Sequence, residues 1–428
     1  MRKKVLIITY YWPPAGGPGV QRWLKFVKYL PDFDIQPIVY IPENASYPII
    51  DEALHSDVKP GTEILTHPIK EPYKIAQILS KKSTKSISSG IIPEERKQSL
   101  SEQLLLFVRG NFFIPDARIG WVKPSVDFLS EYLDKNPIDV MITTGPPHSL
   151  HLIGKQLKDK FDIPWIADFR DPWTTIGYHK KLKLTAAAAK KHQKLEKEIL
   201  TKADRILVTS PSTKKDFEKS TTKPIHLITN GYDIEHIEKK PLDKKFTLAH
   251  IGSLLSDRNP RVLWKALAEL IKNNPDFKRD FELKLAGKIS SQILNALDEF
   301  KLTPYVKNMG YIAHQQAIVE QRTAQVLLLL EIDSEETRAI IPGKLFEYMA
   351  AERPILAIGP EKSDVENLLK QTNTGQYFCY DEKDKISDCI EKMYQQYSEN
   401  KLKSYGIGLQ YFSRKKLTEK LSEIIHQM

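Results

Sequence analysis

The chain has 428 residues, of which 41% are hydrophobic and 28% are charged. This balance, with no apolar run near the roughly 18 residues of a membrane span, is typical of a globular protein and does not predict an integral membrane protein. Domains rarely exceed about 250 residues, so a chain of this length is expected to form two. Its net charge of +10 favours an anionic partner, which could be nucleic acid, an acidic membrane surface or a nucleotide-diphosphate substrate. The alternative is that the charged side chains only keep the surface solvated.

The first residues, 1–9, join a basic start to a short apolar run that leads directly into a Pro/Gly loop. This pattern predicts a buried first strand rather than a signal peptide. The two cysteines, Cys379 and Cys389, have no second pair and no histidine cluster nearby, so neither a disulfide nor a metal site is predicted. We therefore expect a cytoplasmic protein.

Short apolar runs alternate with helical segments along the chain. In the first half these runs are residues 4–9, 37–41, 138–143, 164–168, 204–209 and 225–229; in the second half they are 246–251, 281–286, 306–309, 326–330, 354–358 and 376–380. Such alternation predicts parallel strands joined by crossover helices. The predicted fold class is therefore α/β, with two Rossmann-like, doubly wound domains at residues 1–236 and 246–405.

Two segments depart from this alternation of apolar runs and helical segments. An insertion at about 71–119 contains a polar stretch, 81–90, and an apolar stretch, 104–114, which is either a helix packed on the first domain or a patch that dips into a membrane surface. The final residues, 406–428, read as an amphipathic helix. This helix either closes the second domain or crosses back to the first.

The first strand ends in a glycine-rich loop that contains Gly16 and Gly17 and precedes a helix. Glycines at a strand-to-helix junction let a phosphate or an acceptor approach the backbone, although a tight turn alone also requires glycine. The loop matches neither a dinucleotide-binding fingerprint nor a Walker motif.

Two later turns of the first domain follow predicted strands and carry polar residues. His148 stands in the first, where it is a catalytic candidate or a capping or core residue; Asp168, Arg170 and Asp171 stand in the second. The carboxyl ends of parallel strands form the ligand-binding edge of a doubly wound sheet. The charges of the second turn are therefore either ligands for hydroxyl and phosphate groups or an internal ion pair.

The second domain has two matching candidates. Gly252 ends its first strand, and Arg258 stands close to the start of the next helix. Further on, Gly343 and Lys344 precede a helix that carries Glu347 on its first turn. Two cations beside a helix N-terminus suit a diphosphate, and the carboxylate suits ribose hydroxyls.

These motifs resemble the retaining GT-B glycosyltransferases of family four, group 1. The resemblance rests on residues 230–233, 252–258, 308–312 and the segment through Glu347, whose order and spacing match the family over most of the chain. It implies that Arg258 takes the place of the family's phosphate-binding lysine. It also implies that Glu347 is the second glutamate of the family's E-x7-E signature.

The chain departs from the family pattern at three places. Ser253 stands where an arginine is common, Ala339 stands where the first glutamate is expected, and no histidine is present at 168–171. A branch of the family that acts in polysaccharide assembly has the pattern Pro-x-Lys, an apolar pair and Glu-Tyr. Residues 342–348 fit that pattern.

The resemblance implies transfer of a sugar from a nucleotide-diphosphate donor, with retention, to a glycan or lipid-linked acceptor of a cell-surface polysaccharide. It implies no required cofactor or metal, and no Asp-x-Asp signature stands at a strand end. The catalytic candidates are His148, Arg170 and Asp171. A peripheral contact with an anionic membrane is also expected, but nucleic acid is not. The alternatives are a non-catalytic sugar-nucleotide or polyanion binder and a GT-B nucleotide-sugar epimerase.

Overall fold

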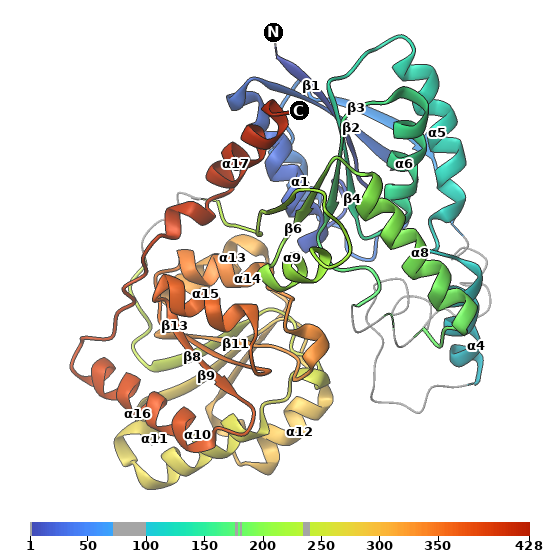
Figure 1. The fold of residues 1–428 in the computed structure, drawn as a ribbon. Coiled ribbons are helices and arrows are strands. Elements are labelled where there is room, and N and C mark those ends of the chain that lie inside the picture. The colour runs from blue at the N-terminus through green and yellow to red at the C-terminus, as the bar shows by residue number, and fades with distance from the viewer. Residues whose placement is uncertain (1, 72–99, 176–178, 180–181, 234–239) are drawn as a thin grey trace. The chain divides into compact units, whose positions relative to one another are not determined.

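The computed structural model describes residues 2–71, 100–175, 179, 182–233 and 240–428 (Figure 1). The chain divides into two compact units. Unit 1 comprises Met1–Asn230 together with Arg414–Met428, and unit 2 comprises Gly231–Ser413. Of the two expected places for the final helix, the structure therefore has the return to the first unit.

Unit 1 is built on a parallel sheet that has seven strands within the described residues, in the order β3-β2-β1-β4-β5-β6-β7. Its strands are β1 Lys3–Ile8, β2 Ile35–Glu43, β3 Glu63–Pro68, β4 Val140–Gly145, β5 Trp165–Phe169, β6 Arg205–Val208 and β7 Ile225–Leu227. The strand order reverses between β1 and β4. The edge strand β3 was not among the predicted strands, and its residues alternate between exposed and half-buried positions instead of forming an apolar run.

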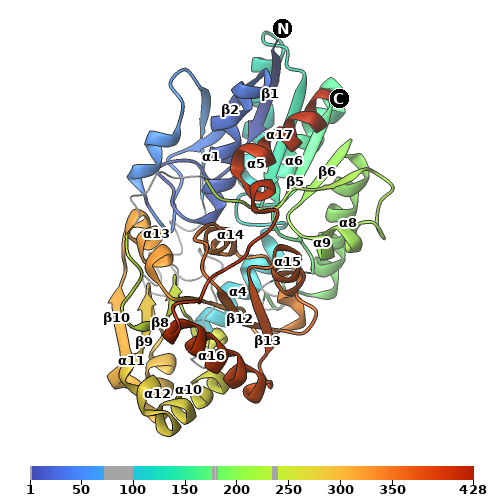
Figure 2. The same cartoon turned by 90° about the vertical axis from the view of Figure 1, so that its left-hand side faces the viewer.

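Helices cover both faces of this sheet, as expected for a doubly wound fold (Figures 1 and 2). Within the described residues the α-helices of unit 1 are α1 Pro18–Tyr29, α4 Leu100–Phe112, α5 Ile119–Leu133, α6 Ser149–Phe161, α8 Ala186–Lys202, α9 Pro211–Phe217 and α17 Arg414–His426. One apolar core joins the sheet to α5 and α6, and the other joins it to α1 and α17.

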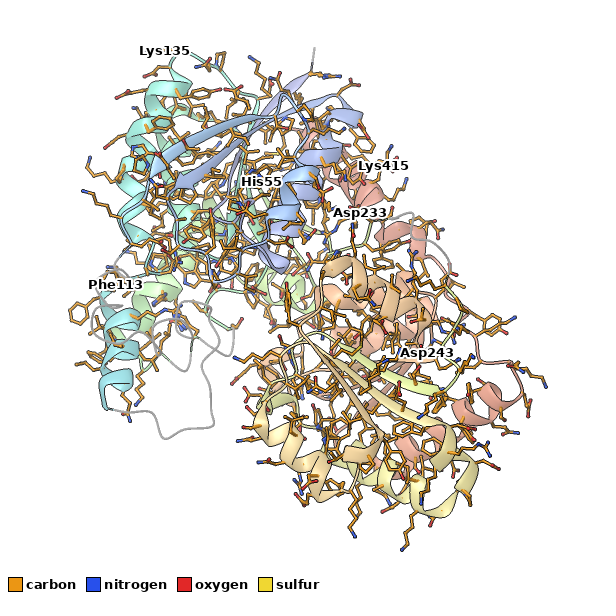
Figure 3. The ribbon with its side chains drawn as sticks, turned by 180° about the vertical axis from the view of Figure 1, so that it is seen from behind. His55, Phe113, Lys135, Asp233, Asp243 and Lys415 are labelled. Atoms are coloured by element: carbon orange, nitrogen blue, oxygen red, sulfur yellow. The ribbon has the colours of Figure 1, made fainter. Side chains whose placement is uncertain are left out.

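The final helix, α17, buries its apolar side against α1 and the sheet of unit 1. The buried side chains are Leu417, Leu421, Ile424 and Ile425. Lys415, which is labelled in Figure 3, lies on the same helix and pairs with Asp32 at 3.4 Å. The spacing that predicted an amphipathic helix is thus explained by burial in unit 1.

Unit 2 repeats the architecture with a parallel sheet of six strands in the described chain, ordered β10-β9-β8-β11-β12-β13 (Figure 2). Its strands are β8 Phe246–Ile251, β9 Phe281–Ala286, β10 Val306–Gly310, β11 Val326–Leu330, β12 Ile355–Gly359 and β13 Gly375–Cys379. All six lie within a residue or so of the predicted apolar runs. The order reverses between β8 and β11.

The helices of unit 2 also cover both faces of the sheet. Within the described residues the unit's α-helices are α10 Arg261–Asn273, α11 Pro275–Asp280, α12 Ser291–Glu299, α13 His314–Thr323, α14 Gly343–Ala350, α15 Asp364–Thr372 and α16 Lys383–Ser398, and the short 3-10 helices are η3 Ser256–Arg258, η4 Thr303–Tyr305, η5 Glu335–Thr337 and η6 Leu409–Phe412. One core includes α10, α12 and α16, and the other includes α14 and α15. Asp243, labelled in Figure 3, precedes β8 and pairs with the buried Lys284 at 2.8 Å.

The predicted insertion of unit 1 contains α4, and Phe113, labelled in Figure 3, directly follows this helix. The side chain of Asn111 contacts the start of α8, where its amide donates to the carbonyl of Lys183 and its oxygen accepts from Thr185. The polar stretch 81–90 lies outside the described residues. Nowhere in the described ranges does a helix have both the length and the apolar character needed to cross a membrane.

Candidate active site

The strand order in the sheet of unit 2 reverses between β8 and β11, and Gly252 lies at the carboxyl end of β8. Its φ of 124° is one that side-chain-bearing residues rarely adopt. A Cβ atom at this position would also lie 2.8 Å from Nζ of Lys344. The backbone conformation therefore favours glycine here, and a side chain would also displace the end of Lys344.

Lys344 lies on the first turn of α14, directly after Gly343, and no side chain caps this turn. Its Nζ is 3.3 Å from Nε2 of His250, a buried residue of β8. Burial and the positive charge of Arg258 lower the pKa of Lys344 to about 7, while the carboxylate of Glu347 opposes the shift. Lys344 thus lies beside Gly252, within electrostatic reach of the other two predicted donor-binding side chains.

Arg258 is the last residue of η3, the short helix that follows β8. Burial lowers its pKa, and the neighbouring Tyr380, Glu331 and Asp257 oppose this shift. In the part of the chain that the structure describes, its buried Nε has no hydrogen-bond partner. The guanidinium therefore retains a donor that a ligand oxygen could accept.

Glu347 is half-buried and contacts two side chains of α13. Its Oε1 lies 3.2 Å from Nε2 of His314, and its Oε2 accepts a hydrogen bond of 3.0 Å from the amide of Gln321. Neither contacting residue was a predicted site residue. The contacts hold the carboxylate along one side of α13 and leave part of it exposed.

Glu331, also absent from the prediction, follows β11 directly and is buried at the point where the strand order reverses. Its carboxylate accepts hydrogen bonds from Ser363 at 3.1 Å and Tyr377 at 2.8 Å. Burial raises its pKa to about 7, against the effect of these bonds and of Arg258. Its signal in the sequence was an acidic residue directly after the apolar run 326–330.

In unit 1, Gly17 stands at the start of α1 with a φ of 91°, and no side chain caps that helix. The amide of Gly16 donates to the carbonyl of Ile49 at 2.9 Å. A Cβ on Gly16 would come within 2.9 Å of the Ile49 side chain, so packing as well as turn geometry restricts this loop. The N-terminus of α1 remains a candidate anion site.

Arg170 binds backbone carbonyl groups on two neighbouring loops. Its Nη1 donates to Gly19 at 2.7 Å, its Nε donates to Gly145 at 3.3 Å, and its Nη2 donates to Pro146. Burial lowers its pKa, and the negative charges of the nearby aspartates oppose this shift. In the structure Arg170 links the turn after β4 to the start of α1 through these hydrogen bonds.

Asp168 forms an internal ion pair, one of the two alternatives that the sequence predicts for its turn. Its partner is Arg22 of α1. Both side chains are 0% exposed, and their closest contact is 2.9 Å. The carboxylate also accepts from Trp23 at 2.7 Å and Thr144 at 2.9 Å, while Arg22 donates to the carbonyls of 228–229. These bonds occupy the lone pairs that a carboxylate offers. Asp168 therefore lies inside unit 1 and does not face solvent.

His148 is only 3% exposed and stacks on Trp173, with ring centroids 4.9 Å apart. Within the described residues neither of its ring nitrogens has a hydrogen-bond partner. Burial lowers its pKa well below the ordinary value, and nearby positive charges contribute. The ring is neutral at pH 7 and covered by protein. Asp171, by contrast, is half-buried at the end of the same turn as Arg170, and burial raises its pKa.

The structure thus brings Gly252, Arg258, Gly343, Lys344 and Glu347 together at the switch point of unit 2. In unit 1 it brings Arg170 and Asp168 to the ends of β4 and β5, where both bind other parts of that unit. Among the residues with described positions, no group of three or more His, Cys, Asp or Glu side chains could hold a metal ion.

Two family models match the chain and together span most of it. The model described as Glycosyltransferase Family 4 matches residues 90–236, and the model described as Glycosyl transferases group 1 matches residues 245–396. The boundary between these matches lies close to the division between units 1 and 2. No curated protein matches the sequence.

Solved structures with the same architecture include three with very low sequence identity. Sucrose-phosphate synthase from Thermosynechococcus elongatus has 15% identity and a TM-score of 0.62, with coverage of 100% of this chain and 99% of that one. A glycosyltransferase from Rickettsia africae has 12% identity and a TM-score of 0.62, covering 100% and 98%. The lipopolysaccharide outer core galactosyltransferase WaaB has 14% identity and a TM-score of 0.60, covering 99% of each chain. At such identities the likeness establishes the GT-B fold.

Proposed function

The chain belongs to the family-four glycosyltransferases of group 1, and we propose that it is a retaining enzyme that uses a nucleotide-diphosphate sugar. The acceptor is a glycan or a lipid-linked glycan of a cell-surface polysaccharide. One observation carries this proposal: Arg258, Lys344 and Glu347 lie close together where the strand order in the sheet of unit 2 reverses. Two cations and a carboxylate at such an edge match the diphosphate and the ribose of the donor.

In the proposed reaction the bond between the sugar C1 and the diphosphate oxygen breaks, and the acceptor oxygen bonds to C1 on the same face. The acceptor proton passes to the departing phosphate. Arg258, Lys344 and the N-terminus of α14 stabilise the negative charge that develops on the leaving group. These groups supply positive charge without a metal ion, so we propose that none is required.

The candidate residues of unit 1 are assigned different roles in this proposal. Asp171 is the one we assign to the acceptor, because it is half-buried and makes no hydrogen bond to another residue in the described part of the chain. Arg170 and Asp168 are assigned to holding the loops, on the evidence of their internal bonds. His148 supports the acceptor side through its packing on Trp173.

Substituting Arg258 or Lys344 by Ala is expected to weaken binding of a nucleoside diphosphate by roughly tenfold to hundredfold. The reason is the loss of one charge-assisted contact worth about 1.5–3 kcal/mol. Binding of the parent nucleoside is expected to stay unchanged, whereas Glu347→Gln weakens both ligands. Calorimetry with UDP, GDP and ADP and with their nucleosides measures these affinities.

Arg261→Ala is the matched control, because Arg261 is an exposed arginine of α10 that pairs with Glu299. Its affinities are expected to equal those of the wild type. Equal losses for nucleoside and diphosphate in Arg258→Ala contradict the phosphate assignment. If the wild type binds a sugar nucleotide without ever releasing nucleotide, the binding-protein alternative is correct. Sugar inversion without an acceptor-linked product identifies an epimerase.

We also propose peripheral contact with an anionic membrane through α4 and the first turns of α8. Leu104 is 62% exposed and Phe112 is 72% exposed, which is unusual for large apolar side chains on a packed helix. The exposed Lys190 and Lys191 stand on α8, whose start is bonded to Asn111 of α4. Apolar side chains beside lysines suit the interface of an anionic bilayer.

Replacing Leu104 and Phe112 together by Ser is expected to reduce co-sedimentation with phosphatidylglycerol vesicles by at least tenfold. Each lost side chain removes about 1.5–3 kcal/mol of apolar burial. Leu294→Ser, at an exposed leucine of unit 2, is the control and should leave sedimentation unchanged. Sedimentation of the double variant at the wild-type level would rule out this contact surface.

A further inference from the structure

His250 is a buried histidine within an otherwise apolar strand. It lies in β8, two residues before Gly252, and is 0% exposed. Burial lowers its pKa well below the ordinary value, and the charge of Lys344 adds to this shift. The ring is therefore neutral at pH 7 and carries one N–H group.

Two contacts of the ring favour one nitrogen as the carrier of the proton. Nδ1 lies 3.0 Å from the carbonyl oxygen of Leu328, a group that only accepts hydrogen bonds. Nδ1 must therefore carry the hydrogen, and Nε2 has a lone pair. Nε2 lies 3.3 Å from Nζ of Lys344, and the charged form of this lysine, an ammonium group, only donates. The tautomer with hydrogen on Nδ1 satisfies these two contacts, and a backbone hydrogen bond with Ser253 also acts on the ring and raises its pKa.

Lys344 needs such an anchor because of the charges around it. Arg258 repels its ammonium group, and Glu347 attracts it. The lysine side chain is also long and flexible, with a charge that is compact and mobile. A neutral acceptor on a buried strand fixes the ammonium beside Gly252 and leaves its positive charge available. An aspartate in the same place would cancel that charge.

We propose that His250 is a positioning residue for the donor diphosphate, because its Nε2 holds the Lys344 ammonium beside Gly252 at the end of β8. The inference rests on the proposed function, in which Lys344 contacts phosphate. It adds a residue that touches no substrate and acts through the lysine. The ligand class concerned is the diphosphate group that all nucleotide-diphosphate sugars share.

The test compares two substitutions in the full chain with inorganic pyrophosphate as the probe. His250→Asn retains a donor near the Nδ1 position, for Leu328, and has no acceptor at the Nε2 position. His250→Gln places an amide at the Nε2 position and loses the Nδ1 group. We expect Asn to weaken pyrophosphate binding roughly threefold to tenfold, as for one ordinary hydrogen bond, and Gln to restore most of the affinity. A merely structural role for the Leu328 contact predicts the opposite order.

Lys344→Met distinguishes the phosphate site itself from the role of His250. In that background His250→Asn should cause no further loss of affinity, since the group it positions is gone. If Lys344→Met itself leaves pyrophosphate binding unchanged, the proposed phosphate site is wrong. If Lys344→Met weakens binding but His250→Asn does not, the site stands and the role of His250 is wrong.

A measurement on the wild-type protein avoids dependence on how the variants fold. Nitrogen chemical shifts of a sample labelled in histidine identify the tautomer of each ring, and through-bond correlation to the backbone amides of the wild-type protein assigns the signal of His250. The proposal requires hydrogen on Nδ1 and none on Nε2. A ring protonated on Nε2 overturns it.

Discussion

A chain that ends at Ser413 is expected to lose the folded state of unit 1. Leu417, Leu421, Ile424 and Ile425 pack into one of the two cores of that unit. Burial of one large apolar side chain is worth about 1.5–3 kcal/mol, so the four together contribute roughly 6–12 kcal/mol. A whole domain is stable by only about 5–15 kcal/mol. The loss therefore matches or exceeds the free energy that keeps unit 1 folded.

Urea unfolding followed by tryptophan fluorescence tests this expectation, because Trp12, Trp23, Trp121, Trp165 and Trp173 all belong to unit 1. The single substitution Leu421→Ala gives a milder version, with an expected loss of about 2–5 kcal/mol. Glu423→Ala, at an exposed position of the same helix, is the control and should change little. A truncated chain with the wild-type unfolding midpoint would mean that α17 does not stabilise unit 1.

Substituting Arg22 by Met is expected to destabilise unit 1 by about 3–5 kcal/mol, because it leaves the buried Asp168 without its cation. The substitution also removes the donors to the carbonyls of 228–229. Asp168→Leu should cost a similar amount by leaving the guanidinium unpaired. The double variant should be more stable than either single variant, since it removes both buried charges. Urea unfolding measures all three.

The control for this pair is Lys123→Met. Lys123 pairs with Asp127 on the surface of α5, and an exposed pair of this kind contributes about 0–1 kcal/mol. Asp168→Asn adds a functional readout. Should it abolish sugar transfer while the free energy of unfolding remains at the wild-type value, Asp168 acts on the acceptor and not as a scaffold residue.

The sequence was sufficient to predict the α/β architecture because most strands are buried on both faces. In unit 2 each strand is an apolar run, such as 326–330, that ends at a turn. The strand β3 lacks this signal because it lies at the edge of its sheet, where water covers one side. Only its pairing with β2 identifies it as a strand, and pairing with a distant segment cannot be read from local composition.

The candidate site was predictable where its residues are close in sequence. Lys344 and Glu347 stand on one helical turn after a strand-to-helix loop, so their shared position followed from the motif. Arg22 was not predictable as the partner of Asp168, because the two lie on different elements that only the tertiary fold brings together. His250 was missed because a histidine inside an apolar strand gives no motif of its own.

The position of Lys344 has a consequence for how this sequence can vary. Nζ of the lysine occupies the space that a side chain at Gly252 would need. An alanine at 252 would therefore displace the ammonium without any change at 344. Two positions far apart in the chain share one volume, and the flexible end of the lysine is the part that would yield. The position of the charge at 344 therefore depends on glycine at 252, although the lysine itself could be retained.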